Sequence, residues 1–168
     1  DKAGALVLEH PGTAVIGTGF YILAAGATET DGPPGAIVIG DALQSIGCDV
    51  VYVTDRYTAP LMTAVVGPRA TVIVFPITDE PASREFAAGL LSRVDASVVI
   101  SIERCGLDRE GVYRNMHGQD ISRYNATLDY LFLAHPATVG IGDGGNEIGM
   151  GVLASVIPTV PTLVKDPC

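Results

Sequence analysis

The chain has 168 residues, of which 48% are hydrophobic and 17% are charged, and its 10 basic and 19 acidic residues give a formal net charge of −9. A chain of this length can bury about 70% of its unfolded surface, so we expect a folded domain and exclude a disordered protein. The acidic balance argues against nucleic acid and anionic membranes as partners, because few cations could neutralise their phosphates. No apolar run reaches the roughly 20 residues that a spanning helix needs.

Short β-branched runs alternate with longer segments that have helical spacing. In chain order, the runs predict strands over 14–18, 48–54, 71–75, 97–102 and 138–141, and a weaker strand over 156–164, where two prolines favour an edge or a loop. The intervening segments predict helices over 35–46, 57–66, 81–94, 122–133 and 145–154. This alternation predicts the α/β class: three layers, with a mostly parallel sheet and helices on both faces, in one domain over 1–168.

Ligands of such sheets bind in the loops at the carboxyl ends of the strands, which here are residues 17–35, 55–57, 103–122 and 142–147. The cysteines point to no site of their own: Cys48, Cys105 and Cys168 are widely spaced and odd in number, which fits neither a zinc knuckle nor a disulfide framework. A reducing compartment is therefore expected. Only Cys105 falls in one of these loops, and without a paired histidine we do not expect it to be a nucleophile.

The glycine-rich loop from Gly142 to Gly151 carries the strongest local signal. Glycines at a strand-to-helix turn let the backbone approach a ligand, and the N–H groups at the start of the predicted helix would face an anion. Asp143, Asn146 and Glu147 add an amide and two carboxylates. The amide suits a carboxylate, and the acids suit an ammonium group or a divalent cation. The alternative is a tight turn with an ordinary helix cap.

The loop after the predicted strand 97–102 begins with Glu103 and Arg104. Arg104 could hold a carboxylate with two hydrogen bonds, and Glu103 could carry a proton if burial raises its pKa. The alternative is a structural Glu–Arg pair that fastens the loop. Asp120, followed by Ser122, could simply begin the next helix, and His117 is interpreted as an ordinary loop histidine without a role as a base.

The loop after the first predicted strand contains Glu29, Thr30 and Asp31. Thr30 or Asp31 could cap the following helix, but one cap does not explain two acids at the end of a strand. The Gly17-x-Gly19 pair is similar to the start of a dinucleotide fingerprint. No third glycine and helix follow directly, so a nucleotide cofactor is not favoured.

Together these loops resemble the D-glutamate cyclase family. The resemblance covers residues 18–151 and rests on five stretches in the family's order: TGF (18–20), ETDGPPG (29–35), IER (102–104), YxNMxGxDIS (113–122) and GIGDGGNEIGMG (140–151). Two departures stand out. Cys105 occupies a position where the family leads us to expect proline, and the domain is expected to be incomplete at its carboxyl end relative to the family.

The resemblance implies a hydro-lyase that cyclises D-glutamate to 5-oxo-D-proline with loss of water, in the cytoplasm if bacterial and in the mitochondrial matrix if eukaryotic. We expect D-glutamate as the partner, no nucleic acid or membrane, and we leave a homo-oligomer open. Catalysis is assigned to Glu103, Asp143 and Glu147. The residues assigned to substrate binding are Thr18, Gly19, Glu29, Thr30, Asp31, Arg104, Asn115, Asp120, Gly144, Gly145 and Asn146.

No cofactor is certain, but a carboxylate is a poor electrophile, so a divalent cation (Mg²⁺ or Mn²⁺) would help. Its ligands would be Asp31, Asp143 and Glu147. Two alternatives stay open: a non-catalytic α/β domain that binds an amino acid or another small anion, and another amino-acid lyase or racemase. Lys2 and Lys165 lie outside the matched loops, so no lysine is placed for a pyridoxal Schiff base.

Overall fold

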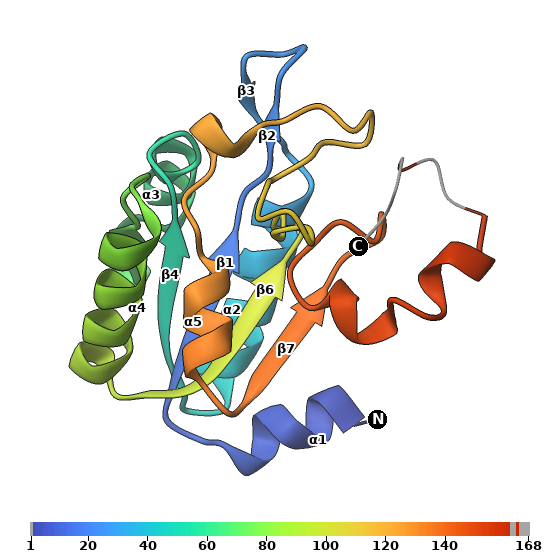
Figure 1. Ribbon diagram of the computed structural model, residues 1–168. Helices are drawn as coiled ribbons and strands as arrows, with labels where there is room; N and C mark the ends of the chain where they lie inside the picture. Colours follow the sequence, from blue (N-terminus) through green and yellow to red (C-terminus); the bar gives the residue numbers. More distant parts are fainter. Residues whose placement is uncertain (1, 162–163, 165–168) are drawn as a thin grey trace.

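The computed structural model describes residues 2–161 and 164 and has a five-stranded parallel sheet with helices on both faces (Figure 1). The order across the sheet is β5-β4-β1-β6-β7. The strands are β1 (Thr13–Thr18), β4 (Asp49–Thr54), β5 (Thr71–Val74), β6 (Ala96–Ile102) and β7 (Thr138–Ile141). The predicted three-layer α/β class is confirmed, and each of these five strands was predicted to within two residues.

Alternate side chains of each strand pack against different helices. Ala14 and Ile16 of β1 lie in a buried cluster with side chains from one group of helices, α1 (Lys2–Glu9), α2 (Gly32–Ser45) and α3 (Ala59–Val66). Val15 lies in a second cluster with α4 (Glu80–Val94) and α5 (Asp129–Ala134). Both faces of the sheet are therefore buried, which explains the high mean hydropathy of +0.36 without a membrane span. None of the described helices is long and apolar enough to cross a bilayer.

The chain reverses its direction of winding at β1. The first crossovers lead from β1 through α2 to β4 and through α3 to β5, while β6 and β7 lie on the other side of β1. The carboxyl ends of β1 and β6 are therefore neighbours from which the chain departs in opposite directions. Such a point opens a crevice above the sheet, where ligands of doubly wound folds bind.

Two predicted helices differ from the observed structure. Residues 122–133 form a short 3-10 helix, η2 (Ser122–Tyr124), and then only α5. Residues 145–154 form no α-helix, and only a 3-10 turn, η3 (Met150–Leu153), occurs there. Gly145 and Gly149 adopt φ values of +96° and +94°, which a right-handed helix does not allow. The Ile148 N–H donates instead to the Arg104 carbonyl, 2.8 Å away, so this segment pairs with the loop after β6.

Other short elements were not predicted from the sequence. Helix α1 and the hairpin of β2 (Tyr21–Ile22) and β3 (Ala27–Thr28) were missed, as was the 3-10 helix η1 (Gly67–Arg69). In Figure 1 the hairpin rises above the carboxyl end of β1. The weak strand predicted over 156–164 is wrong within its described part, where η4 (Ile157–Thr159) forms, and residues 162–163 lie outside the described residues.

Candidate active site

A cavity of about 290 Å³ lies at the carboxyl ends of the strands, beside the reversal at β1. The described part of the chain contributes five acids to its lining, from three loops that are distant in sequence. They are Glu29 and Asp31 after β1, Glu103 after β6, and Asp143 and Glu147 after β7. The fold thus brings together the acids that the sequence singled out in separate loops.

Three of these acids form a compact trio. A carboxylate oxygen from each of Glu103, Asp143 and Glu147 lies within 4.8 Å of the others. Burial, followed by the charges of Glu147 and Asp143, raises the pKa of Glu103 from 4.5 to about 7. Burial and the neighbouring Asp31 also raise the pKa of Glu29. Glu103 is therefore suited to exchange a proton near neutral pH, and the trio could instead hold a cation that offsets its charge.

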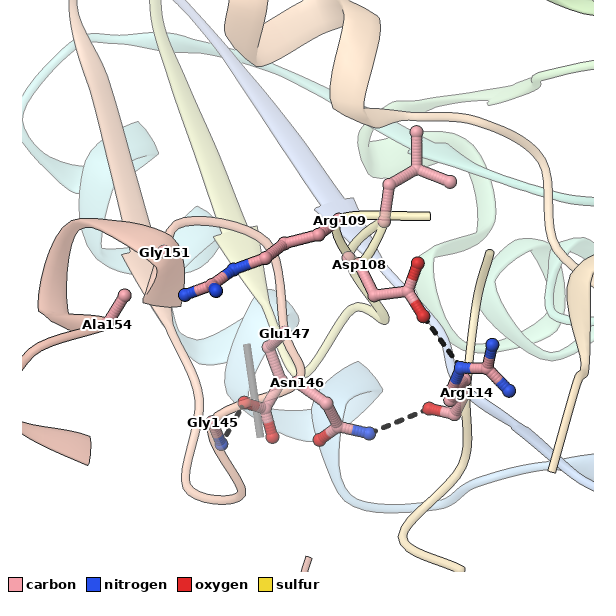
Figure 2. Close-up of a pocket in the computed structure, with 10 residues that line it drawn as sticks. Asp108, Arg109, Arg114, Gly145, Asn146, Glu147, Gly151 and Ala154 are labelled. Carbon is pink, nitrogen blue, oxygen red and sulfur yellow. Dashed lines mark hydrogen bonds and ion pairs between the residues drawn. The ribbon is translucent and has the colours of Figure 1, made fainter. Parts of the chain in front are cut away.

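The Glu147 carboxylate is buried and fixed by the backbone of its own loop. Its oxygens accept hydrogen bonds from the N–H groups of Gly144 and Gly145 at 2.8 and 2.7 Å, and Figure 2 shows the bond to Gly145. These are the N–H groups that were expected to receive an anion at the start of a helix. That prediction is corrected in one respect: the helix is absent, and in this structure the anion at these groups is the protein's own Glu147.

Glu103 stands at the end of β6 in an uncommon backbone conformation, with φ of +46°. Non-glycine residues in this region are strained and gather at functional sites. Gly32, the first residue of α2, packs closely beside it, since a Cβ on Gly32 would lie 2.8 Å from the Glu103 Cβ and 2.6 Å from the Thr18 Oγ1. Glycine at position 32 therefore lets the start of α2 approach the site.

The helix cap predicted for this region has a different form. Asp31 occupies the N-cap position of α2, but its side chain makes no capping hydrogen bond. The next turn contains Pro33 and Pro34, which have no N–H to be capped. The exposed Asp31 carboxylate lines the cavity instead. Thr30 is exposed as well and is not among the described lining residues.

Arg104 does not line the cavity, so it is not placed to bind a substrate carboxylate as the sequence had predicted. Its side chain is 0% exposed, and it donates to the Asp55 carboxylate at 2.6 Å and to the carbonyls of Gly19 and Ala126 at 2.7 Å each. Arg104 thus fastens three loops together beneath the site. A structural ion pair was the alternative to this role, but the partner is Asp55, in the loop after β4, rather than Glu103.

The remaining predicted residues divide between the cavity and its frame. Asn115, Gly144 and Asn146 line the cavity. The Asn146 Nδ2 donates to the Arg114 carbonyl at 2.9 Å (Figure 2). The others belong to the frame: the Thr18 side chain is fully buried, the Gly19 carbonyl accepts from Arg104, and the Asp120 carboxylate accepts from the Ser122 N–H, as in the helix-start alternative.

The structure adds lining residues that sequence reasoning missed: Phe20, Ile22, Leu23, Ala24, Met116, His117, Gln119 and Val164. These residues reach the cavity because of how the hairpin and the 113–121 loop are placed in the fold, and no local sequence pattern predicts that placement. A second cavity of about 240 Å³ lies on the other side of Asn146 and Glu147, beside Arg109 (Figure 2). Cys105 is poorly suited to act as a nucleophile, because its thiol is buried and burial raises its pKa.

Comparisons with known proteins identify the family of this chain. A family profile described as D-glutamate cyclase-like, C-terminal, matches residues 2–166. The human protein named D-glutamate cyclase, mitochondrial, is 31% identical in an alignment of 173 positions that covers 90% of this chain. The aligned part is 28% of the human protein's length. On the extent of the profile match, this chain belongs to the D-glutamate cyclase-like C-terminal family.

Proposed function

We propose that this chain is a hydro-lyase that cyclises D-glutamate to 5-oxo-D-proline with loss of water. The single observation that carries the proposal is the trio of Glu103, Asp143 and Glu147, whose carboxylate oxygens lie within 4.8 Å of one another inside a cavity of about 290 Å³. Membership of the D-glutamate cyclase-like family supports the same substrate.

The charges of the cavity suit one end of this substrate. D-glutamate carries one ammonium group and two carboxylates, and a cavity lined by acids attracts the ammonium group. The ammonium nitrogen and the side-chain carboxyl must meet for the ring to close. A site that holds these two groups close together can lower the activation barrier of ring closure by several kcal/mol.

The reaction conserves protons overall. The amine nitrogen forms a bond to the carbon of the side-chain carboxyl, and one carbon–oxygen bond of that carboxyl breaks. Two protons of the ammonium group end on the leaving oxygen, which departs as water. Glu103 is suited to carry them, because its pKa of about 7 leaves both its acid and its base form populated near neutral pH.

The trio also fits a divalent cation. Two opposite ligands of Mg²⁺ lie about 4.2 Å apart, so a small rotation of the exposed Asp143 would bring oxygens that lie within 4.8 Å into its coordination range. A bound Mg²⁺ or Mn²⁺ would polarise a carboxyl group and offset the charge of the pocket. Compared with the sequence-based ligand set, Glu103 replaces Asp31, which lines the same cavity outside the trio.

The test is chiral chromatography of D-glutamate, L-glutamate and 5-oxoproline after incubation with the purified chain, with EDTA and with Mg²⁺ or Mn²⁺. We expect 5-oxoproline from the D-enantiomer and at least a hundredfold loss of turnover in Glu103→Gln and Asp143→Asn. Glu85→Gln, which neutralises an exposed acid on α4, is the control and should keep full activity. Absence of turnover by the folded wild type under every metal condition would refute the proposal.

The alternative of a non-catalytic binding domain makes a different prediction for the same variants. A binding domain would bind D-glutamate, form no 5-oxoproline, and keep its affinity in Glu103→Gln and Asp143→Asn. For the cyclase, the wild type forms 5-oxoproline and these two variants lose most of the turnover. The compartment proposed for a eukaryotic source is the mitochondrial matrix, in keeping with the name of the human relative.

A further inference from the structure

The cavity is lined by more hydrogen-bond acceptors than donors, and its acids would repel the α-carboxylate of the substrate. The α-carboxylate of D-glutamate takes no part in ring closure and stays charged in the product. It must bind in a cavity whose described lining contains five acids and no lysine or arginine. Hydrogen-bond donors that point away from the acid trio are therefore required.

Most of the polar donors at the cavity already have protein acceptors. The Asn146 Nδ2 donates to the Arg114 carbonyl, and the Gly144 N–H donates to Glu147. The Asn115 Nδ2 donates to the Gln119 Oε1 at 2.9 Å. Among the side chains that the described residues contribute to the lining, the nitrogen donors with no acceptor in the protein are the Nε2 of Gln119 and the ring of His117, both exposed at the rim of the cavity.

The turn from Asn115 to Gln119 fixes the direction of the Gln119 amide. The Asn115 Oδ1 accepts from the N–H groups of His117 and Gln119, at 3.0 Å each, so these backbone donors settle which end of the Asn115 amide is oxygen. Its other end must then be the donor Nδ2, and the Gln119 atom beside it must be the acceptor Oε1. The Gln119 Nε2 is thereby left as the donor end of its amide, and this assignment follows from the two backbone N–H groups.

We propose that Gln119 and His117 bind the α-carboxylate of the substrate, and that Asn115 positions them. The inference rests on the proposed function for the identity of the ligand. Asn115, which is 8% exposed, uses both ends of its amide within the turn and is a positioning residue rather than a substrate ligand. His117, interpreted from the sequence as an ordinary loop residue, becomes a specificity-determining one.

Gln119→Glu is the sharpest variant, because it keeps the acceptor oxygen that Asn115 needs and replaces only the Nε2 donor by a charged acceptor. We expect its KM for D-glutamate to rise at least tenfold while kcat stays within threefold, since the change weakens binding and leaves the acid trio intact. His117→Ala should raise KM by about three- to tenfold. Arg109→Ala, which removes an exposed cation of the neighbouring cavity, is the matched control and should leave KM unchanged.

Calorimetric binding of 5-oxo-D-proline and D-glutamate to each variant separates this inference from the proposed function. The lactam keeps the carboxylate and lacks the ammonium group, so its Kd reports the carboxylate subsite alone. Weaker binding of both ligands by Gln119→Glu supports the subsite, even if the wild type shows no turnover and the cyclase proposal fails. Unchanged Kd values in Gln119→Glu and His117→Ala, or a loss of binding in Arg109→Ala instead, or no binding of either ligand by the wild type, would overturn it.

Discussion

Ionisation of Glu103 should lower the free energy of unfolding as the pH rises, and a variant without this charge should lack that loss. In the folded protein burial and the neighbouring acids raise the pKa of Glu103 from 4.5 to about 7. Below pH 4.5 the carboxyl is protonated in both the folded and unfolded states. Between pH 4.5 and 7 the unfolded state releases the proton more readily, so the free energy of unfolding falls until the pH exceeds 7.

The size of this loss follows from the two pKa values. A difference between 4.5 and about 7 corresponds to about 3 kcal/mol at 1.36 kcal/mol per pH unit. Glu103 is only partly buried, and water screens its repulsion from the other acids, so we expect about 1–2 kcal/mol in practice. Glu103→Gln has nearly the same shape and no charge, and should therefore be more stable than the wild type by this amount at pH 8.

Urea unfolding from pH 4.5 to 8.5, in EDTA to remove bound cations, measures the difference. The wild-type free energy of unfolding should fall by about 1–2 kcal/mol more than that of Glu103→Gln across this range. Glu85→Gln, at an exposed position on α4, controls for the loss of one negative charge. Parallel pH profiles for the wild type and Glu103→Gln would refute the reasoning, because they would mean that Glu103 ionises as it does in water.

Other variants test the frame around the site. Asp55→Asn keeps the shape of the side chain that pairs with Arg104 but leaves the Arg104 guanidinium buried without a countercharge. The free energy of unfolding, measured in urea, should therefore fall by about 3 kcal/mol, and a loss below about 1 kcal/mol would contradict a buried pair. Gly142→Ala places a Cβ 2.7 Å from the Glu147 Cδ and should displace the Glu147 carboxylate. We therefore expect turnover to fall at least tenfold while the circular dichroism spectrum stays unchanged. Full activity would show that catalysis does not depend on the position of Glu147. Native alkylation at pH 8 should modify Cys48 and spare Cys105, whose pKa is raised by burial, as peptide mass mapping would show; rapid labelling of Cys105 would disprove its burial.

The glycine-rich loop shows where sequence reasoning stopped. The Gly142–Gly151 stretch was placed correctly after β7, and its Asp143 and Glu147 line the cavity. The helix predicted to follow does not form, because the segment finds hydrogen-bond partners in the loop after β6, such as the Arg104 carbonyl, which accepts from the Ile148 N–H. Such partners are distant in sequence, so no local pattern reports them, and the carboxylate that occupies the loop's N–H groups cannot be foreseen from spacing.

The sequence by itself determined the layers of this protein. Periodic β-branched runs and apolar helical faces specify local structure, and burial of both sheet faces follows from them. Tertiary structure alone decided which charges meet: it buried Arg104 against Asp55 and set Glu103 beside Asp143 and Glu147. The physical reason is that hydrophobic periodicity is a property of neighbouring residues, whereas an electrostatic environment depends on distances that only the packed loops define.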